Sequence, residues 1–538
     1  MSAKILSPTW FPVPRAISQL GSLGITATII VILAILPLLY VLSYGLELSI
    51  EQWKALWSHR IPELLLNTLT LAIIVAVFSL ILGISSAWIV ARKSFTGRKL
   101  AIWLLLLPLT IPTYVFAHIY TVLLDEDGWL GGLWVFFFGD KLAIPDLSNV
   151  FGVAFVLALA GFSYIFLLVR ASLSHSTKNL EEAAQLQGAS GREIFLKINL
   201  PLMRPAIAAG LAVIVLHVLS DFGAVSMLRY QTFTLSIYNQ MSGRMDYNAA
   251  AGLSFILIAL SLSFLVLERF FRSRQRFFSG AQTNKIERQA ASIKQQVIIW
   301  IWLGLVTTFS FFLPLAWMLH WSFDAWQQNL LDSAFWQYCI NSGVISFAAA
   351  TIALIIAFPI AFYHTRKHSL LSNTYIQLSS VGFALPGPVI ALGVLAFVLA
   401  QLPFIYGTMA ALIIAMVIRF LPLAIQAQEA SLQQLTPSIE EAGRVFGAGP
   451  VENLRRVVLP VVSGGMATAW VLVFIDALKE LPATLILRPT GFDTLPVRIW
   501  IEASEEMLEL AAPSALMLVI GTLPAIWIMR KSEKMGRA

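Results

Sequence analysis

The chain has 538 residues, of which 58% are hydrophobic and only 12% are charged. A soluble domain carries about 25% charged residues, and surface-to-volume scaling demands a polar shell at any size, so the composition excludes a soluble globular protein. The net charge of +7 does not indicate a nucleic-acid partner, because the basic residues flank apolar runs instead of covering one face.

Apolar runs long enough to cross a bilayer, about 20 residues each, recur along the whole chain. We therefore predict an all-α integral membrane protein with about twelve transmembrane helices. The first run is longer than the apolar core of a signal peptide and is predicted to be a retained helix. The run 373–401 contains Pro386 and Pro388 and is predicted to be bent, and the aromatic segment 125–148 is predicted to be a hairpin at the outer interface. The runs lie near 24–46, 64–91, 99–124, 149–173, 204–228, 249–270, 296–320, 341–364, 373–401, 404–428, 462–487 and 510–530.

The distribution of Lys and Arg predicts the orientation, because these residues are enriched in cytoplasmic segments. With both termini placed inside, 27 of the 36 basic residues fall on inner segments and seven on outer ones. The polar stretch 272–295 is then a cytoplasmic linker between two homologous six-helix halves, residues 1–271 and 296–538.

Two inner segments, 179–201 and 438–460, match without gaps at an offset of 259 residues. Asn179 and Ser438 stand three residues before a glutamate, a capping-box spacing that starts a helix, and Thr436 is a competing start for the second copy. The identical pairs are Glu181/Glu440, Glu182/Glu441, Ala183/Ala442, Gly188/Gly447, Ala189/Ala448, Glu193/Glu452, Leu200/Leu459 and Pro201/Pro460.

A second short helix is predicted after the paired glycines, which suit the left-handed residue that ends a helix. Ser190 stands three residues before Glu193, and Gly449-Pro450 places proline in the first turn. Each half is thus predicted to display two short helices on the cytoplasmic face.

The order Glu-Ala-Ala, Gly, Leu-Pro resembles the signature loop of the permease subunits of bacterial ABC importers, and the resemblance covers nearly the whole chain. The second copy departs from it with Gly443 in place of the second alanine. The resemblance implies a transport subunit of the bacterial inner membrane, not an enzyme. It implies as partners a dimer of ATP-binding subunits and a periplasmic or lipid-anchored solute-binding protein. The residues that it assigns to ATPase coupling are Glu181, Glu182, Ala183, Gly188, Pro201, Glu440, Glu441, Ala442, Gly447 and Pro460.

The duplication extends beyond these segments. Residues 220–224 (SDFGA) align with 479–483 (KELPA), and Asn67 matches Asn341 at an offset of 274, so the first half carries a 15-residue insertion, expected within 125–148. The SDFGA motif and the run 228–234 (LRYQTFT) resemble the ferric iron permeases. Thiamine permeases share the fused layout, so thiamine or another small solute stays an alternative.

Two acids lie inside predicted spans. Asp221 stands about 25 Å from the inner face at 1.5 Å per residue, and Glu480 has the matching depth. Intramembrane acids are functional candidates, and Gly223 and Pro482 indicate broken helices that line a cavity. Either the two acids line an outer gate and meet a cationic solute, or each pairs with a neighbour such as Lys479.

His217, four residues before Asp221, lies on the same helical face. It fits a packed polar residue better than an iron ligand, because ferric ions prefer oxygen ligands. The outer acids are either a docking surface for the binding protein or a solvated helical face: Glu502, Glu505, Glu506 and Glu509.

Several chemistries are not indicated. The chain has no GxxxxGK[ST] phosphate loop, so we expect it to bind no ATP, and no Ser-His-Asp or HExxH group. Cys339 is the single cysteine, which excludes an intrachain disulfide and a cysteine-based metal site. No metal site and no cofactor are predicted. An ion-coupled secondary transporter is the rival class, since such proteins also have repeats and broken helices; the duplicated inner segment argues against it.

Overall fold

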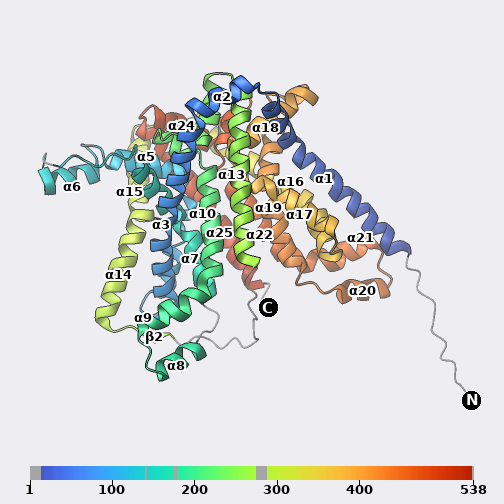
Figure 1. The fold of residues 1–538 in the computed structure, drawn as a ribbon, viewed down its shortest axis with the longest axis horizontal. Coiled ribbons are helices and arrows are strands. Elements are labelled where there is room, and N and C mark those ends of the chain that lie inside the picture. The colour runs from blue at the N-terminus through green and yellow to red at the C-terminus, as the bar shows by residue number, and fades with distance from the viewer. Residues whose placement is uncertain (1–13, 140–141, 174–177, 274–287, 536–538) are drawn as a thin grey trace, which may run out of the picture.

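The computed structural model describes residues 14–139, 142–173, 178–273 and 288–535, and it is an all-α membrane protein (Figure 1). In this part of the chain, nine helices are long and apolar enough to cross a membrane, or eleven if each of two bent pairs counts as one span. The twelfth expected span corresponds to the shorter apolar helix Leu508–Pro524. Both chain ends and most of the predicted linker 272–295 lie outside the described residues.

Each predicted span of the first half corresponds to a helix or to a broken pair of helices. Its elements are α1 (Pro14–Leu46), α2 (Ile50–His59), α3 (Ile61–Arg92), β1 (Lys93–Ser94), α4 (Arg98–Leu104), η1 (Leu107–Thr110), α5 (Thr113–Leu123), α6 (Trp129–Phe138), α7 (Val150–Leu173), α8 (Lys178–Leu186), α9 (Gly191–Ile194), η3 (Phe195–Asn199), α10 (Leu200–Ser220), α11 (Gly223–Met227), α12 (Phe233–Tyr238), η4 (Asn239–Gly243) and α13 (Tyr247–Ser273).

The second half repeats this order after β2 (Gln289–Ala290), which pairs in parallel with β1. Its elements are α14 (Ile293–Thr307), η5 (Thr308–Phe312), α15 (Leu313–Gln327), α16 (Ser333–Arg366), α17 (Leu370–Ala384), α18 (Gly387–Gln401), η6 (Pro403–Ile405), α19 (Met409–Leu432), α20 (Pro437–Val445), α21 (Pro450–Asn453), η7 (Leu454–Val458), α22 (Leu459–Leu478), α23 (Pro482–Leu487), α24 (Leu495–Ser504) and α25 (Leu508–Met535).

The third span of each half is sharply bent at a proline. The chain turns by 104° between α17 and α18, as predicted, with Pro386 at the start of α18. The run 99–124 was predicted as a span with no bend expected, and it bends by 95° before α5, which Pro112 precedes. Proline lacks the amide that would continue the helical ladder.

The fifth spans are shorter than predicted because each breaks just before its intramembrane acid. The run 204–228 is divided into α10, which ends at Ser220, and the short helix α11. Likewise, 462–487 is divided into α22, which ends at Leu478, and α23. The predicted breaks beside Gly223 and Pro482 are therefore present in both halves.

The segment 125–148, predicted to be a hairpin at the outer interface, contains the helix α6, which projects from the side of the molecule (Figure 1). After the helix the chain returns alongside it, since the Trp134 indole donates to the Leu142 carbonyl at 3.0 Å. The equivalent stretch between α18 and α19 holds only the short turn η6. The extra residues of the first half thus lie where the sequence offsets place them.

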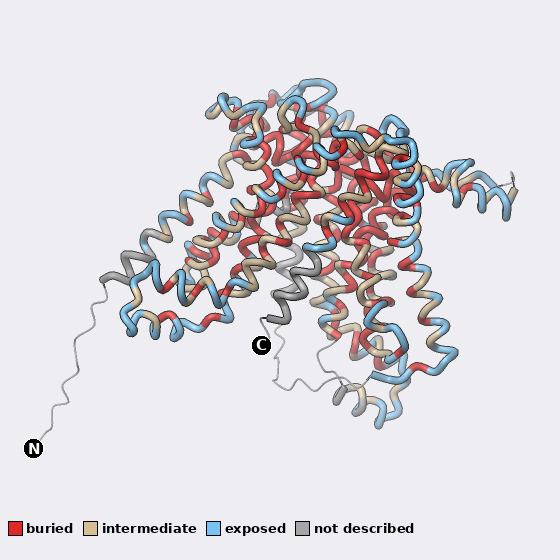
Figure 2. The backbone as a smooth tube through the Cα atoms, turned by 180° about the vertical axis from the view of Figure 1, so that it is seen from behind, coloured by how far each residue is buried: buried red, intermediate tan, exposed pale blue. Residues whose placement is uncertain are grey.

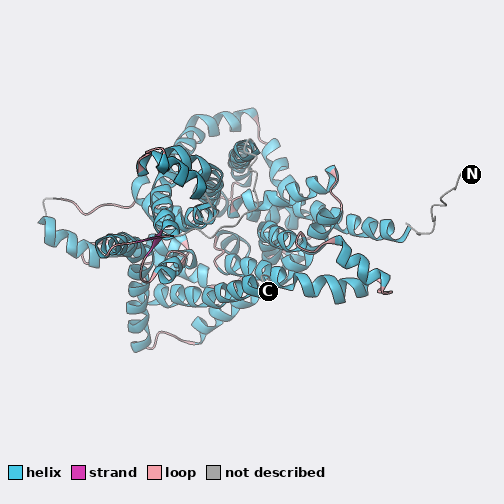
Figure 3. Cartoon of the chain, turned by 90° about the horizontal axis from the view of Figure 1, so that it is seen from below, coloured by secondary structure: helices cyan, strands magenta, loops and turns pink. Residues whose placement is uncertain are grey.

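The two halves exchange their first helices. Helix α1 packs against α16, α17 and α18 of the second half, and α14 and α15 contact α3 and α5 of the first (Figure 1). Seen from below, the molecule consists almost wholly of helices (Figure 3). Each apolar core cluster accordingly contains residues of both halves: Trp317 and Met318 belong to the cluster around α3 and α7, and Val41 belongs to the cluster around α16 and α19.

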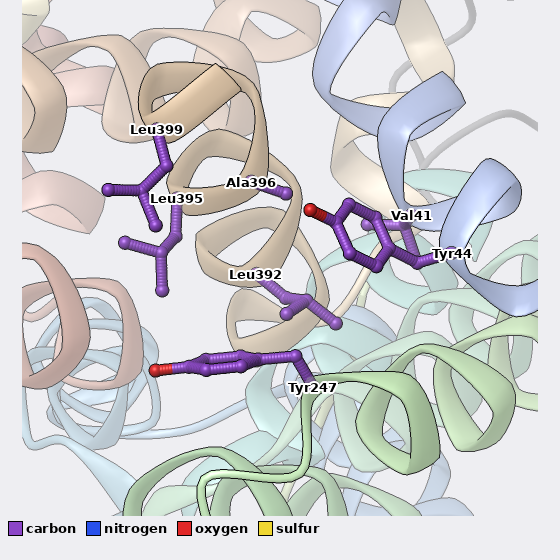
Figure 4. Close-up of a pocket in the computed structure, with 7 residues that line it drawn as sticks. All are labelled: Val41, Tyr44, Tyr247, Leu392, Leu395, Ala396 and Leu399. Atoms are coloured by element: carbon purple, nitrogen blue, oxygen red, sulfur yellow. The ribbon is translucent and has the colours of Figure 1, made fainter. Parts of the chain in front are cut away.

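Buried residues gather toward the upper end of the molecule, and the lower ends of the helices are more exposed (Figure 2). At the upper end, a small apolar pocket lies between α1, α13 and α18 (Figure 4). Its lining includes no charged side chain, so it does not offer ligands for a metal ion. The lining residues are Val41, Tyr44, Tyr247, Leu392, Leu395, Ala396 and Leu399.

Candidate functional site

The first coupling unit, residues 179–201, is the predicted pair of short helices. Gly188 has φ +83° after α8, a conformation that suits glycine, and the Ala189 amide donates to the Ala184 carbonyl at 3.0 Å. Ser190 and Glu193 form the predicted capping box at the start of α9. The Ser190 amide, together with Lys197, lowers the pKa of Glu193 to about 2.

The second coupling unit, residues 438–460, has the same form, with Gly447 at φ +87° and Pro450 first in α21. Ser438 does not cap α20, because the helix begins at Pro437 and Thr436 holds the cap position. Asn179 likewise lies inside α8 and is not its cap. Gly443 departs from alanine for a steric reason: a Cβ there would lie 2.5 Å from Asn453 Oδ1.

An Arg–Glu pair fastens the first coupling unit to its half. Arg92, the last residue of α3, forms an ion pair with Glu181 and donates to Asn199 Oδ1 at 2.8 Å. Its guanidinium lies 5.2 Å from the ring centroid of Trp88, an attractive cation–π distance. The Glu181 side chain is 18% exposed.

The second half contains the same arrangement. Arg366, the last residue of α16, pairs with Glu440, and its Nε donates to Glu440 Oε1 at 2.6 Å. It lies 5.4 Å from the ring centroid of Phe362, and the Glu440 side chain is only 5% exposed. Sequence reasoning missed both arginines, although they stand 274 residues apart, the offset already seen between Asn67 and Asn341.

Each unit also exposes apolar side chains at the end of its first helix. Leu186 is 90% exposed in α8, and at the equivalent place Val445 is 84% and Phe446 90% exposed. Both units lie at the lower end of the molecule, on opposite sides (Figure 1).

The remaining predicted coupling residues are placed as follows. Ala183, Glu441 and Ala442 are exposed. Pro201 and Pro460 stand in the first turns of α10 and α22. The side chain of Glu182 lies outside the described residues.

At the opposite end, Asp221 caps the short helix α11. Its carboxylate accepts from the Thr113 hydroxyl at 2.5 Å and from the Ala224 amide at 2.9 Å. Gly223 allows close packing there, since a Cβ would lie 2.9 Å from the side chain of Tyr114. Asp221 is therefore a buried carboxylate held by neutral donors.

Glu480 holds the equivalent place at α23, next to Pro482. It accepts from the Ala483 amide at 3.1 Å and from Arg419 Nη1 at 2.9 Å. Its cationic partner is thus Arg419 and not the adjacent Lys479. Gly387 replaces Thr113 here, and a Cβ at this position would clash with the Arg419 guanidinium and lie 2.5 Å from Pro482 Cγ.

Further charged groups from both halves lie close to these acids. His217 interacts electrostatically with Asp221, Asp476 and Lys479, and its ring centroid lies 6.1 Å from that of Tyr164. Lys479 Nζ is 3.5 Å from Asp476 Oδ1 and donates to the Leu109 carbonyl of the first half at 3.2 Å. Among the residues that the structure describes, no group of three or more His, Cys, Asp or Glu could hold a metal ion.

The outer acids do not form one exposed face. Glu505 and Glu506 are exposed, but Glu502 is buried and pairs with Arg498 at 2.8 Å. Burial raises the pKa of Glu502, and Arg498 partly offsets this effect.

Comparison with known proteins identifies the class. Residues 79–277 and 349–535 match the family described as binding-protein-dependent transport system inner membrane component. Because the match is duplicated and covers more than half of the chain, the protein belongs to this family. It is a multi-pass inner membrane permease of an ABC importer, a transport subunit and not an enzyme.

Named relatives refine this picture. The chain is 30% identical to the Fe(3+)-transport system permease protein FbpB 2 of Haemophilus influenzae, over 92% of this chain and 95% of that protein. It is 25% identical to the ferric transport system permease protein FbpB of Actinobacillus pleuropneumoniae, over 87% and 71%. The sulfate transport system permease protein CysT of Escherichia coli is 28% identical over 45% of this chain and 88% of its own length. The predicted resemblance to fused ferric permeases is confirmed.

Proposed function

We propose that this chain is the fused permease subunit of a ferric iron importer, with both termini in the cytoplasm. Two ATP-binding subunits dock on the coupling units, and a binding protein delivers the solute at the outer face. The observation that carries the coupling assignment is the duplicated Arg–Glu pair. In each half it joins a coupling unit, with its exposed apolar tip (Leu186, or Val445 with Phe446), to the end of a membrane-spanning helix. The assignment of iron is supported by the similarity to two ferric permeases, which extends over 92% and 87% of this chain.

The proposed mechanism is alternating access. ATP binding draws the two partner subunits together and moves the coupling units with them. Since Arg92 ends α3 and Arg366 ends α16, motion of a coupling unit is transmitted to the inner end of a span. The inner ends approach one another while the outer ends separate, and hydrolysis reverses the motion.

Thiamine or another small solute is the second candidate, because a permease of a different solute, sulfate, is also similar to one half. The two cases are distinguished by purifying the chain with its ATPase and reconstituting it in proteoliposomes. We expect ATP-dependent uptake of iron supplied on a ferric binding protein, and none of thiamine. Uptake of thiamine instead would refute the iron assignment, and uptake driven by an ion gradient without ATP would refute the whole class.

Docking is tested at the exposed tips. Leu186→Glu combined with Phe446→Glu is expected to abolish co-purification of the ATPase, because a charge cannot be buried in an apolar contact without a large cost. A matched control is Ile293→Glu, which changes an apolar residue that is 82% exposed outside the coupling units. If the ATPase still binds the double variant, the coupling assignment is wrong.

A further inference from the structure

The ammonium of Lys479 lies beside oxygen atoms that could also bind a dissolved cation. Its Nζ contacts the carboxylate of Asp476 at 3.5 Å and the main-chain carbonyl of Leu109 at 3.2 Å. Carboxylate and carbonyl oxygens are the ligands of hard cations. The carbonyl is available because the chain bends by 95° after η1, so the next helical turn does not continue the ladder there.

This contact joins the two halves. Leu109 belongs to the bent third span of the first half, and Lys479 follows α22 of the second half. At the offset of 259, Lys479 corresponds to Ser220, whose hydroxyl only bonds the His217 carbonyl of its own helix at 3.1 Å. Asp476 corresponds to His217. The ammonium and its carboxylate are therefore features of the second half alone.

The other charges nearby already have strong partners. Asp221 is held by Thr113 and by backbone amides, and Glu480 is held by Arg419. Asp476, by contrast, is 35% exposed, and its ion pair is the 3.5 Å contact to Lys479. Of these three acids, Asp476 has the carboxylate that a passing solute could reach most easily.

We propose that Lys479 is a tethered cation that closes the outer gate, and that a positively charged solute displaces it from Asp476. A bound solute cation competes with the ammonium for the Asp476 carboxylate, and repulsion between the two cations favours expulsion of the ammonium. Expulsion breaks the bond to Leu109 and removes this contact between the bent third span of the first half and the second half. Asp476 is then the cation-contacting residue of the gate. The part about the solute rests on the proposed transport of iron, whereas the closure by Lys479 rests only on the proposed orientation of the spans.

Closure is tested by thiol accessibility in a Cys339→Ser background, with a reporter cysteine in place of the half-buried Ser220. The protein is held in proteoliposomes without ATP, and a membrane-impermeant thiol reagent is added from the outer side. We expect Lys479→Met to raise the modification rate about tenfold, as expected for loss of a charge-assisted hydrogen bond. Lys479→Gln, which keeps a donor but not the charge, is expected to fall between Met and the parent.

Closure by Lys479 would be overturned by equal modification rates in the parent and in both variants, provided that each has an unchanged thermal unfolding midpoint. If Lys479→Met does not fold, the Gln variant decides alone, because it preserves the size and polarity of the side chain.

The cation contact is tested separately with Asp476→Asn in the assembled importer. We expect iron uptake to fall at least about tenfold, while the reporter at position 220 becomes more accessible because the ion pair is lost. Greater accessibility with full uptake would overturn the role of Asp476 as a cation contact. Absence of iron uptake by the unmodified importer would refute the proposed function and leave the accessibility result standing.

Discussion

Asp221 and Glu480 hold equivalent places in the two halves, yet their charges are compensated differently. Asp221 relies on the Thr113 hydroxyl and on amides, and Glu480 has the guanidinium of Arg419. Gly387 stands where the first half has Thr113, and it leaves room for that guanidinium. The duplicated backbone was kept while the charges diverged, so the outer ends of the two halves are not interchangeable.

At the inner ends, by contrast, the two halves have kept the same charged pairs. Arg92 with Glu181 and Arg366 with Glu440 repeat the same pair at the same place. We interpret this as the result of a common task, since each inner end is proposed to meet the same kind of ATP-binding subunit. Substitutions at equivalent positions of the two halves are therefore expected to have different effects near Asp221 and Glu480. They are expected to have similar effects in the two coupling units.

The largest effect is expected for the inner pairs. Arg366→Ala leaves the Glu440 carboxylate, 5% exposed, with only the 3.8 Å contact to the more exposed Arg444 and is expected to cost about 3 kcal/mol of stability. Arg92→Ala is expected to cost less, because Glu181 is 18% exposed and water compensates part of the loss. Thermal unfolding in detergent measures both.

The control for this pair is the double variant Arg366→Ala with Glu440→Ala. Removing both charges is expected to recover part of the stability lost in the single variant, because no unpaired buried charge remains. A double variant as unstable as the sum of the two singles would show that the ion pair is not what holds the unit.

The outer ends provide a second comparison. Gly387→Ala forces a Cβ against the Arg419 guanidinium and Pro482 and is expected to cost about 2 kcal/mol, as overpacking does. Thr113→Val removes one hydrogen bond to Asp221 and is expected to cost about 1 kcal/mol. If the order of the two unfolding midpoints is reversed, the account of how the charges diverged is wrong.

Equal effects are expected at the glycines between the short helices. Gly188→Ala and Gly447→Ala each force a side chain into the left-handed region, at φ +83° and +87°, at a cost of about 1 kcal/mol. No heavy atom lies within 4 Å of either added Cβ, so the strain is conformational alone. ATPase stimulation by the reconstituted permease is expected to fall equally in the two variants, and a difference above twofold would contradict the equivalence of the units.

The smallest effect is expected at Ser190. Ser190→Ala removes the cap of α9 and is expected to cost about 0.5 kcal/mol. The pKa of Glu193 is lowered to about 2, below its unfolded value of about 4.3, so the part of the stabilisation that comes from the Ser190 hydroxyl donating to this carboxylate is present above pH 5 and is lost as the pH falls toward 2. The bond from the Glu193 amide to the Ser190 hydroxyl does not titrate, so the difference between the variant and the parent is expected to shrink in acid without vanishing, and a difference that grows in acid would exclude the capping box as its source.

The sequence predicted features that depend on neighbouring residues. The spans, the Ser190 capping box, the proline start of α21 and the breaks at Gly223 and Pro482 all follow from local patterns. The contacts that it did not predict join residues that are far apart in the chain. Arg92 and Glu181 are 89 residues apart, and Arg366 and Glu440 are 74 apart, so no local spacing joins them.

Two other misses have local causes. The 95° bend before α5 was overlooked because the surrounding run is mostly apolar, and prolines such as Pro108 and Pro112 are often tolerated within a span. The helix α6 was overlooked because its glycines and the nearby Pro145 suggested a turn, whereas WLGGLWVFFF forms one short helix.

The central claim is that partner ATPases move the two coupling units toward each other. It is tested most directly by spin labels at Lys197→Cys and Arg456→Cys in a Cys339→Ser background, at equivalent exposed positions. The distance between the labels is measured in the complex with the ATPase, without nucleotide and with ATP trapped. The account predicts a shorter distance with ATP, and an unchanged distance in a complex that still transports would contradict it.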